Sequence, residues 1–512
     1  MFDVGQGFLA SVARDPGALA IVDGARRLYY ADWADEIRRV ATGLGKIGLN
    51  KGDHLVSVLQ NRLDAATLHW ACQIAGIVIV PLNWRATAAE LDDVLADADA
   101  RAVAFETATA GIVADARHVR GIPRLAIGDA VGDRHLGDFR QCEPLSALPS
   151  IEAGDTSLML YTSGTTGRAK GVPRSHGAER AAALAHVAQN LYRFGECTLG
   201  VMPLYHTMGV RSLLAMAAIN GCFVCLPRFD AGKALTLIAR ERISALYLVP
   251  TLYHDLLADP GFPAADIASV TKLGYAGATM TDGLLARLNK AFRPELFVNH
   301  YGSSEIYTFT VEQDAAGKPG SAGKAGLNQE IRVIRLGYAN PKDTVAPGTE
   351  GQIAARLDGD ESFAGYWRRP DADEKALCGG WYLTGDIGYF NPNGDLFVTG
   401  RVDDMMITGG ENVSPVEVES VLSLHPCVGE VAVAGLADPR WGQKVTAFVT
   451  RAGKVDAKSL DKFCRASDLA NFKRPRGYVF VTAIPKSPVG KILRRLLVAG
   501  EYELDQEGNR NA

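Results

Sequence analysis

Between about Leu28 and Asn299, short apolar runs rich in β-forming residues alternate with segments of helical periodicity. The alternation is clearest in the order HLVSVLQN, AATLHWACQIAG, VIVPLN, AAELDDVLADA and AVAFE. Strands that alternate with helices are typical of a mainly parallel sheet whose faces are covered by helices. No segment repeats at the period of about 20 to 50 residues that marks a solenoid. The alternation therefore predicts an α/β protein rather than a repeat protein.

The pattern changes twice toward the C-terminus. Beyond Glu330 it becomes short alternating strands and turns, with a hairpin signal at Asn393-Gly394. After Gly400-Arg401-Val402 it changes again, to helix SPVEVESVLSLHP, strands VGEVAVAGLA and KVTAFVTR, and helix DAKSLDKFCRAS. We therefore expect a large N-terminal domain, 1–402, of layered αβ sheets plus a β-rich subdomain, and a small α+β C-terminal domain, 403–512.

The composition limits the partners and the location. The chain has 512 residues, of which 47% are apolar and 22% charged, with a net charge of −4. Acidic and basic residues nearly balance, so no overall field attracts nucleic acid or an anionic membrane. The first residues lack a positively charged segment followed by an apolar core, and no apolar stretch reaches the roughly 18 residues of a membrane span. We expect a cytoplasmic protein with no membrane and no nucleic-acid partner.

The eight cysteines are scattered along the chain, which is typical of reduced, buried thiols rather than of a disulfide framework. Only Cys222 and Cys225 have the spacing of a metal or redox motif. They lie in an apolar run that predicts a strand, with no second pair and no adjacent histidine. We therefore expect them to be core residues.

The segment Tyr161–Gly171, YTSGTTGRAKG, directly follows the apolar run Leu158–Leu160. Small residues let the backbone approach a ligand, and successive N–H groups with Ser and Thr hydroxyls can surround phosphate oxygens. Lys170 adds a positive charge. The spacing does not match the Walker A pattern G-x-x-x-x-G-K-[ST]. We interpret the segment as a phosphate-binding loop of another kind; the alternative is a glycine-rich surface turn.

A basic segment near the C-terminus contains no acidic residue. Its cations are Lys473, Arg474, Arg476, Lys486, Lys491, Arg494 and Arg495. The residues alone leave two interpretations open, a solvated basic surface or an edge that faces phosphate groups.

Further motifs follow in order along the chain. They are YGSSE (301–305), WYLTGD (381–386), GRVDDMMITGGENVSPVEVE (400–419) and PKSPVGKILRR (485–495). Together with YTSGTTGRAKG they resemble the motifs of the acyl-adenylate-forming superfamily, which includes the acyl-CoA synthetases, and they extend over the whole chain. One departure is Ala169, where the family loop usually has proline before the lysine. Without that proline the loop should be slightly looser, with no hydrogen-bond donor lost.

The resemblance implies a two-step reaction. A carboxylate is a poor electrophile, so ATP first converts the acid to an acyl-AMP anhydride with release of pyrophosphate, and the thiol of CoA then displaces AMP. Because the first step joins two anions, it needs positive charge between them. By resemblance, Lys491 supplies that charge as a catalytic residue, Glu305 and Thr162 help to hold Mg²⁺, and the cofactors are ATP, Mg²⁺ and CoA.

The same resemblance implies the other nucleotide contacts. Asp386 is suited to accept both ribose hydroxyls, a recurring role of carboxylates, and Arg401 contacts the same ribose. The alternatives are a turn residue for Asp386 and a surface ion pair for Arg401. The implied nucleotide-binding set is Thr162, Ser163, Gly164, Thr165, Thr166, Gly167, Lys170, Gly277, Ala278, Thr279, Tyr301, Ser304, Asp386 and Arg401.

In this superfamily the small domain is mobile, because the adenylating lysine would block the path of the thiol to the carbonyl. Asp403 matches the hinge position. After rotation, Gly409 and Gly410 in TGGEN would line a tunnel for the pantetheine arm of CoA. The implied contacts of the CoA nucleotide are Trp441, which could stack on adenine, and Arg474 and Arg85, which could meet phosphates. For Arg85 the alternative is an ordinary surface arginine.

The motifs MPLYH, AGATM, RWGQ and FKRP are most similar to those of aryl-CoA ligases such as the chlorobenzoate enzymes. We therefore expect a small aromatic acid; substituted benzoate, hydroxycinnamate and furoate all remain open. Arg211 and His300 could bind a ring hydroxyl, a heteroatom or a second carboxylate, or could face outward. The implied acid pocket is His206, which also has a catalytic role, with Arg211, Ala276, His300 and Tyr307.

Other hypotheses share part of these motifs. They are an adenylating enzyme for an aliphatic acid, an enzyme that loads the thiol of a carrier protein, a luciferase-like oxidase, and a nucleic-acid module built on the basic segment. The balanced charge speaks against the last of these. The sequence does not specify the oligomeric state, although a homodimer is common among similar proteins.

Overall fold

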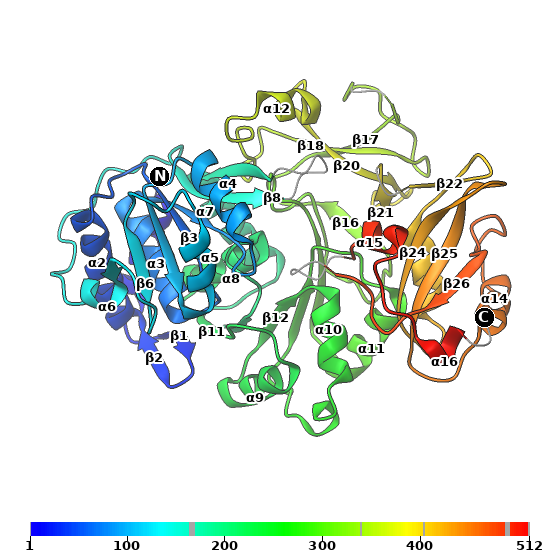
Figure 1. Ribbon diagram of the computed structural model, residues 1–512, viewed down its shortest axis with the longest axis horizontal. Helices are drawn as coiled ribbons and strands as arrows, with labels where there is room; N and C mark the ends of the chain where they lie inside the picture. The colour runs from blue at the N-terminus through cyan, green and yellow to red at the C-terminus, as the bar shows by residue number, and fades with distance from the viewer. Residues whose placement is uncertain (1, 163–168, 338–339, 403–404, 487–491, 510–512) are drawn as a thin grey trace.

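The computed structural model describes residues 2–162, 169–337, 340–402, 405–486 and 492–509. Within these residues the strands form three sheets. Figure 1 shows the chain running from the blue and cyan elements at one end of the molecule, through green and yellow elements, to the orange and red elements at the other end.

The first sheet has the order β7-β6-β5-β3-β4-β8-β9 in the described residues. Its strands are β3 (His54–Val58), β4 (Val78–Pro81), β5 (Ala102–Glu106), β6 (Arg124–Ile127), β7 (Arg134–His135), β8 (Thr156–Thr162) and β9 (Lys170–Ser175). All pairs are parallel except β8 with β9. Every residue of β3, β4 and β5 is buried, as expected for parallel strands covered on both faces.

The second sheet is parallel in its middle and antiparallel toward both ends. Its strands are β1 (Leu19–Asp23), β2 (Arg26–Tyr29), β10 (Cys197–Gly200), β11 (Cys222–Cys225), β12 (Ala245–Leu248), β13 (Lys272–Tyr275), β14 (Leu296–Tyr301), β15 (Thr310–Glu312), β16 (Ser321–Ala325), β17 (Ile331–Ile334), β18 (Gly351–Arg356), β19 (Leu377–Cys378), β20 (Trp381–Phe390) and β21 (Leu396–Arg401). Strands β10 to β14 pair in parallel, and β14 to β21 pair antiparallel. The sheet therefore joins the α/β region to the β-rich region.

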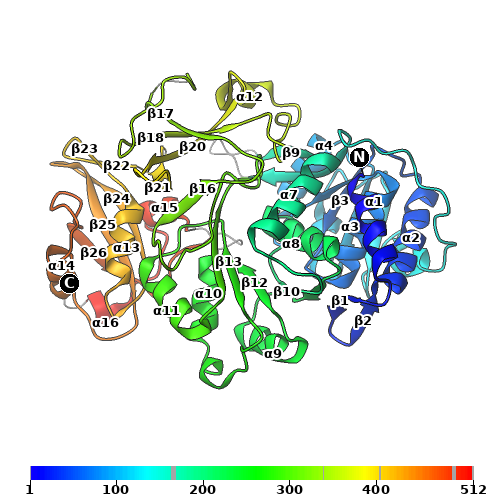
Figure 2. The ribbon, with the colours of Figure 1, turned by 180° about the vertical axis from the view of Figure 1, so that it is seen from behind.

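The helices cover these sheets. They are α1 (Val4–Arg14), α2 (Tyr30–Lys46), α3 (Leu63–Ala75), α4 (Ala88–Asp97), α5 (Ala110–Asp115), α6 (Leu136–Phe139), α7 (His176–Gln189), α8 (Thr207–Ala218), α9 (Ala231–Glu241), α10 (Pro250–Ala258), α11 (Asp282–Phe292) and α12 (Pro370–Ala376). One apolar core includes residues of α1, α3 and α8 together with strands of both sheets. In Figure 2, α7 and α8 lie between the first sheet and β10 to β13. Helices shared in this way bind the two sheets into one unit.

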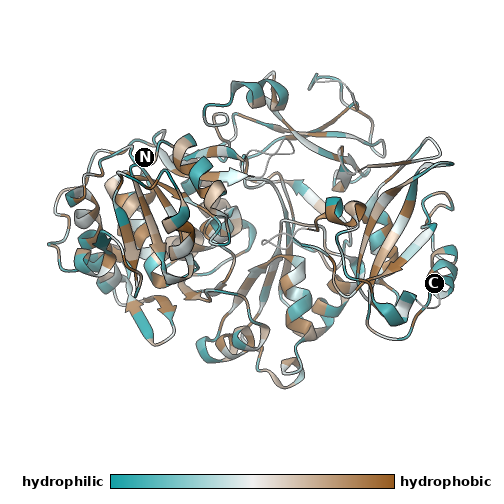
Figure 3. Ribbon diagram, viewed as in Figure 1, coloured by the Kyte–Doolittle hydropathy of each residue, from teal (hydrophilic) through white to brown (hydrophobic). Residues whose placement is uncertain are grey.

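The third sheet belongs to the C-terminal part. Its strands are β22 (Met406–Thr408), β23 (Glu411–Val413), β24 (Val428–Asp438), β25 (Gly442–Arg451) and β26 (Gly477–Phe480), and its helices are α13 (Pro415–Ser423), α14 (Ala457–Arg465), α15 (Arg494–Ala499) and α16 (Gln506–Asn509). Every described strand of this sheet lies after residue 403. Figure 3 shows apolar colour concentrated along its strands, as along those of the other sheets, and hydrophilic colour on the outer helices.

The small C-terminal unit touches the large one where α13 packs on α11, and where β24 approaches α10. The backbone N–H of Gly283 donates to Ser423 Oγ at 3.4 Å, and His254 Nδ1 lies 4.0 Å from Glu430 Oε1. A methyl group at Gly283 would lie 2.3 Å from the carbonyl oxygen of Ser423. The glycine therefore permits this close approach.

Several local predictions are confirmed. The α/β class is correct, the turn that contains Asn393 and Gly394 joins β20 to β21, and Cys222 and Cys225 are buried in β11. All eight cysteines are free. Within the described ranges, every helix is too short or too polar to cross a membrane.

Candidate active site

The predicted phosphate-binding segment begins in β8 and ends in β9. These strands pair antiparallel, with Thr162 opposite Lys170. The apolar run Leu158–Leu160 is buried, so a core strand anchors the segment. The residues of its turn, Ser163, Gly164, Thr165, Thr166 and Gly167, lie outside the described residues and stay predictions.

Lys170, Tyr366 and Glu305 meet at the base of this hairpin. Lys170 Nζ lies 4.0 Å from the centroid of the Tyr366 ring, and the Tyr366 hydroxyl donates to Glu305 Oε1 at 2.7 Å. Burial lowers the pKa of Lys170, an effect that the negative charge of Glu305 opposes. One cation and one buried carboxylate thus lie beside the predicted phosphate loop, and such groups can serve a phosphate and its metal ion.

Arg174 holds the backbone around Glu305. Its side chain is completely buried and forms an ion pair with Glu179 at 2.9 Å. Its Nη1 donates to the carbonyl oxygens of Glu305 at 2.8 Å and Glu361 at 2.6 Å, and its guanidinium lies 4.0 Å from the centroid of the Tyr307 ring. Charge-assisted bonds of this kind are strong inside a protein, so Arg174 joins the hairpin to the two loops that carry Glu305 and Glu361.

The predicted ribose site is assembled from three strands. The Tyr301 hydroxyl, at the end of β14, donates to Asp386 Oδ2 at 2.6 Å. Arg401 Nη1, at the end of β21, lies 3.1 Å from Asp386 Oδ1. Burial and the charge of Asp386 raise the pKa of Tyr301, so its hydroxyl remains a donor at neutral pH. Gly385 has φ +74° and a methyl group there would lie 3.2 Å from Arg401 Nη2, so glycine suits this position.

The predicted adenine wall follows β13. Ala276 is buried, whereas Gly277 and Thr279 are exposed and Ala278 is partly exposed. Gly277 has φ +83°, a conformation that side chains disfavour. Ser304 is partly buried in the loop before Glu305. The backbone of this wall is therefore accessible to a flat ligand, as the sequence predicts.

His206 lies directly before α8 and caps it. Its Nδ1 accepts from the backbone N–H of Met208 at 3.4 Å. The sulfur of Met208 would lie 3.8 Å from a methyl group at Gly277. The first turn of α8, which His206 caps, therefore lies close to the predicted adenine wall.

Arg211, His300 and Tyr307 are all buried, with exposures of 2%, 1% and 3%. The alternative that Arg211 and His300 face outward is therefore wrong. They come from α8, β14 and the loop after Glu305, and Arg211 Nη1 donates to the carbonyl oxygen of Tyr307 at 3.2 Å. The structure thus brings the three predicted pocket residues together.

Gly409 and Gly410 form the turn between β22 and β23. Their φ angles are +60° and +86°, as a two-residue hairpin turn requires. The backbone N–H of Gly409 donates to the carbonyl oxygen of Trp441 at 2.8 Å, and a methyl group at Gly409 would lie 3.0 Å from the Trp441 ring. The predicted tunnel residues and the predicted adenine-stacking residue are thus neighbours, and the Trp441 side chain is partly exposed.

Four of the six described cations of the basic segment are ion-paired, whereas Arg476 and Arg495 are exposed, so both interpretations of the segment stay open. Its ion pairs are Lys473 with Glu417, Arg474 with Asp461, Lys486 with Glu430, and Arg494 with Glu419. Arg474 is also only 8% exposed. A phosphate contact from Arg474 would have to compete with Asp461. These ion pairs could not be predicted from the segment itself, because the acidic partners lie outside it.

Arg85 lies beside a small cavity of about 70 Å³. Its guanidinium lies 3.9 Å from the centroid of the Trp84 ring, and Arg228 and Phe229 line the same cavity. The rest of the lining is mostly apolar, so the predicted phosphate contact of Arg85 stays a prediction.

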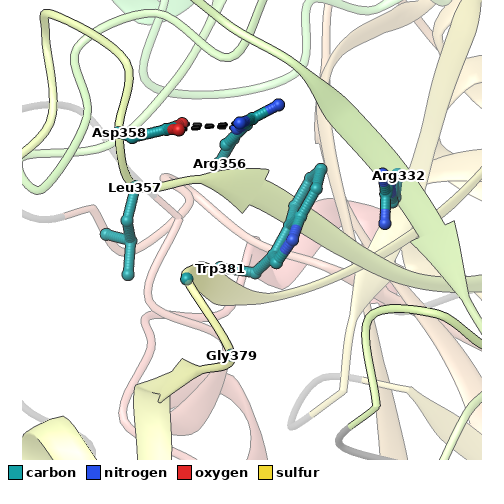
Figure 4. Close-up of a pocket in the computed structure, with 7 residues that line it drawn as sticks. Arg332, Arg356, Leu357, Asp358, Gly379 and Trp381 are labelled. Carbon is teal, nitrogen blue, oxygen red and sulfur yellow. Dashed lines mark hydrogen bonds and ion pairs between the residues drawn. The ribbon is translucent and has the colours of Figure 1, made fainter.

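A larger cavity, of about 500 Å³, lies at the start of β20. Figure 4 shows the Trp381 ring between Arg356, which is joined to Asp358, and Arg332. Arg332 lies 4.2 Å from the Trp381 ring and pairs with Glu330 at 3.0 Å. Because both arginines already have acidic partners, we assign no ligand to this cavity.

Lys491 and Asp403 lie outside the described residues, so their catalytic and hinge roles stay predictions. In Figures 1 and 2, α15 lies on the side of the small unit that faces the large unit, whereas β22 and β23 lie at its outer edge.

Sequence reasoning missed Tyr366 and Arg174. Tyr366 lies in FAGYWRRP, where its aromatic and basic neighbours were only a weak signal of a site. The next residue, Trp367, also contacts the hairpin: its backbone N–H donates to the carbonyl oxygen of Gly171 at 2.9 Å. Arg174 lies in a β-strand whose pattern resembles an ordinary core strand. No signal in the sequence marked its buried ion pair with Glu179.

The sequence matches the family model described as AMP-binding enzyme over residues 8–367, and the AMP-binding enzyme C-terminal domain over residues 417–491. A curated relative, 4-chlorobenzoate–CoA ligase of Arthrobacter sp, is 33% identical over 503 residues, which cover 97% of this chain and 95% of the relative. Long-chain-fatty-acid–CoA ligase FadD13 of Mycobacterium tuberculosis is 31% identical over 477 residues, which cover 92% of each chain.

Among solved structures, ATP-bound MatB from Rhodopseudomonas palustris superimposes with a TM-score of 0.86 at 28% identity, covering 98% of this chain and 99% of that chain. The chain therefore belongs to the AMP-binding enzyme family. Its class of activity is that of an AMP-forming acid–CoA ligase, with ATP and CoA as substrates.

Proposed function

We propose that the protein activates a small aromatic carboxylic acid with ATP and transfers the acyl group to CoA. The observation that carries this proposal is the meeting of Lys170, Tyr366 and Glu305 beside the β8–β9 hairpin of the first sheet. Glu305 follows Tyr301 by four residues, and Tyr301 bonds to Asp386 on the second sheet. The first group of side chains would bind the phosphates of ATP, and Tyr301 with Asp386 would bind its ribose. The acid would lie between them, next to His206.

In the first half-reaction, a carboxylate oxygen of the acid attacks the α-phosphorus of ATP, and pyrophosphate leaves. Lys170 and the predicted loop would bind the β- and γ-phosphates, and Asp386 would accept the ribose hydroxyls with Tyr301 as its hydrogen-bonding support. The predicted role of Lys491 is to lie between the two reacting anions, where a positive charge lowers the barrier.

Mg²⁺ is a proposed participant. Within the described residues there is no cluster of three or more His, Cys, Asp or Glu side chains that could hold a metal ion. Mg²⁺ is usually bound by one or two carboxylates with waters and substrate phosphates, so the oxygens of Glu305 and Thr162 fit such an ion when ATP supplies the rest. Bound there, it would neutralise the leaving pyrophosphate.

In the second half-reaction, the thiolate of CoA attacks the carbonyl carbon of the acyl-AMP, and AMP leaves as the thioester forms. The proposed units, 1–402 and 403–512, would rotate about Asp403 so that Gly409 and Gly410 reach the carbonyl. Trp441 and Arg85 would hold the nucleotide of CoA; Arg474 would join them only on release from Asp461.

The preference for an aromatic acid is supported by the similarity to 4-chlorobenzoate–CoA ligase and by the Tyr247 and Tyr307 rings near Arg211. The second candidate is an aliphatic acid, which the similarity to long-chain-fatty-acid–CoA ligase FadD13 favours. Large buried side chains at Arg211, His300 and Tyr307 leave a long chain little room there, so we favour the aromatic acid.

The test is a panel of aromatic and aliphatic acids in which AMP release is measured with and without CoA, together with exchange of pyrophosphate into ATP. We expect exchange with a small aromatic acid, and AMP release that rises when CoA is added. Exchange with aliphatic acids alone would contradict the aromatic assignment. Turnover with a carrier-protein thiol or pantetheine that CoA does not improve would contradict the assignment of CoA as the acceptor.

A further inference from the structure

A buried polar cluster lies between α7, α8, β12 and β14. Its ring contacts join His186, Tyr247 and His300, with centroid separations of 4.7, 5.1 and 5.4 Å. Asn190 Nδ2 lies 3.0 Å from His186 Nδ1, and its amide lies 3.0 to 3.1 Å from His300 Nε2. Arg211 completes the cluster. Polar groups this deep are costly unless they have partners.

The hydrogen-bond partners of Arg211 in the described residues are all neutral groups. Its Nη1 donates to Thr308 Oγ1 at 2.8 Å and to the Tyr307 carbonyl, and its Nη2 donates to the Tyr247 hydroxyl. Across the described residues its Nε has no partner, and no carboxylate lies within ion-pair distance of it. The charge of Arg211 does act on the buried carboxyl group of Glu361: burial raises the pKa of Glu361, and the positive charge of Arg211 opposes that rise. A buried guanidinium that forms no ion pair is unusual in a protein core.

The two histidines also have free nitrogens. Within the described part of the chain, His186 Nε2 and His300 Nδ1 have no hydrogen-bond partner. Burial and the positive charge of Arg211 lower the pKa of both rings, so both are neutral at pH 7. A neutral imidazole nitrogen can donate or accept, depending on its tautomer.

The cluster lies near Gly277, which follows the predicted pocket residue Ala276 and begins the predicted adenine wall. Met208 and Val249 both approach Gly277, at 3.8 and 3.3 Å from a methyl group placed there. Arg211 follows Met208 by one turn of α8, on the same side of the helix. Tyr247 precedes Val249 by two residues at the end of β12, on the same side of the strand. Arg211 and Tyr247 therefore lie farther from the predicted adenine wall than Met208 and Val249, toward the interior of the protein.

We propose that Arg211, supported by Tyr247 and His300, binds a hydrogen-bond acceptor on the acid, at the side of the ring away from the carboxylate that reacts. The substrate class is then a small aromatic or heteroaromatic acid that carries such an acceptor, a ring heteroatom, a hydroxyl oxygen or a second carboxylate. This inference rests on the proposed function. It explains why Arg211 Nε, although deeply buried, is left without a partner in the protein itself.

The experiment compares ring-matched acids on the whole enzyme by AMP release with CoA present. The apolar acids are benzoate and 4-methylbenzoate, the neutral acceptors are nicotinate, 2-furoate and 3-hydroxybenzoate, and the charged acceptor is isophthalate. We expect at least one acceptor acid to exceed benzoate about 10- to 100-fold in kcat/KM, since the loss of a partner for a buried charged group costs that much. Preference for isophthalate would identify a second carboxylate as the acceptor, and preference for the neutral acids would identify a heteroatom or hydroxyl.

The variants Arg211→Met and Arg211→Lys test the residue itself. In Arg211→Met the ratio of kcat/KM between the best acceptor acid and benzoate should fall about 10- to 100-fold, and Arg211→Lys should recover part of it. Tyr247→Phe, which removes only a hydroxyl, should lower the ratio less. A ratio is insensitive to loss of folded enzyme, because that loss lowers both rates equally.

Two results would overturn the inference. One is a wild-type enzyme that prefers benzoate or 4-methylbenzoate to every acceptor acid. The other is a ratio that stays unchanged in Arg211→Met. In both cases pyrophosphate exchange with an aromatic acid would leave the proposed function intact, whereas absence of exchange with every acid would contradict the proposed function first.

Discussion

Glu305 has one carboxylate oxygen held by the Tyr366 hydroxyl and its backbone carbonyl held by Arg174. A carboxylate fixed in this way needs little reorganisation when a metal ion and a triphosphate arrive, and prearranged groups of this kind are a major source of rate enhancement. The proposed role of Glu305 therefore depends on its charge, whereas the role of Tyr366 depends on orientation.

We expect Glu305→Gln to reduce acid-dependent pyrophosphate release about 100-fold, because the amide keeps a partner for Tyr366 and loses the charge that a metal ion requires. The Mg²⁺ concentration needed for half-maximal rate should rise at the same time. Tyr366→Phe is the matched control, in which the rate should fall about tenfold or less with the Mg²⁺ requirement unchanged. Equal effects of the two substitutions on the Mg²⁺ requirement would rule out a metal role for Glu305.

Lys170 gives a second prediction, in pH dependence. Burial lowers its pKa from the usual 10.5, so in the free enzyme its ammonium loses its proton at a lower pH than an exposed lysine does. If the charged form binds phosphates, kcat/KM for ATP should decline on the alkaline side before pH 10.5. In Lys170→Arg the guanidinium stays protonated, and the decline should move to higher pH. Superimposable alkaline limbs in pyrophosphate release would mean that Lys170 does not bind the nucleotide.

At the scale of elements, the turn Gly409–Gly410 and the ring of Trp441 form one surface of the small unit. Because both glycines have positive φ, the hairpin presents bare backbone beside the ring. A surface of this kind suits a narrow pantetheine chain that leads to an adenine.

We expect Trp441→Ala to raise KM for CoA about 10-fold, since stacking of a base on an aromatic ring contributes about 1–3 kcal/mol. Pyrophosphate exchange, which needs no CoA, should not change. Trp441→Phe retains a ring and should have an intermediate KM. The assignment fails if the alanine variant has a normal KM for CoA with supplied acyl-AMP.

Which of these elements the sequence could predict depends on how local their signals are. The strand before the phosphate loop, the hairpin at Asn393-Gly394 and the helices of the small unit followed from periodicity and turn residues within short windows. Arg174 with Glu179, and Tyr366 with Glu305, did not follow. Glu179 lies only five residues after Arg174, but in the next helix, and Tyr366 and Glu305 come from different loops. The spacing within one strand or loop does not record which side chains the fold brings against it.

At the scale of the whole molecule, contact between the units passes through α11 and α13. Gly283 lies at the second position of α11, and its missing side chain lets the carbonyl oxygen of Ser423 approach. If the two units adopt this arrangement during adenylation, a side chain at Gly283 should disfavour that half-reaction alone.

We expect Gly283→Ala to slow pyrophosphate release about 10-fold or more, because its methyl group would meet the Ser423 carbonyl and overpacking of this kind costs about 1–3 kcal/mol. Conversion of supplied acyl-AMP to thioester should be unaffected. Gly232→Ala is the matched control: Gly232 is also second in its helix, α9, and a methyl there makes ordinary contacts at 3.7 Å. Equal slowing of both half-reactions in Gly283→Ala would show a general packing defect.

The ion pairs of the basic segment have a consequence for this motion. Lys473, Arg474, Lys486 and Arg494 each pair with an acidic residue of the same small unit. These charges would travel together during a rotation, so none of the four would have to be rehydrated along the way. Added salt should then have little effect on the rotation of the small unit. It should lower turnover mainly by weakening the binding of ATP and CoA, which are both highly charged.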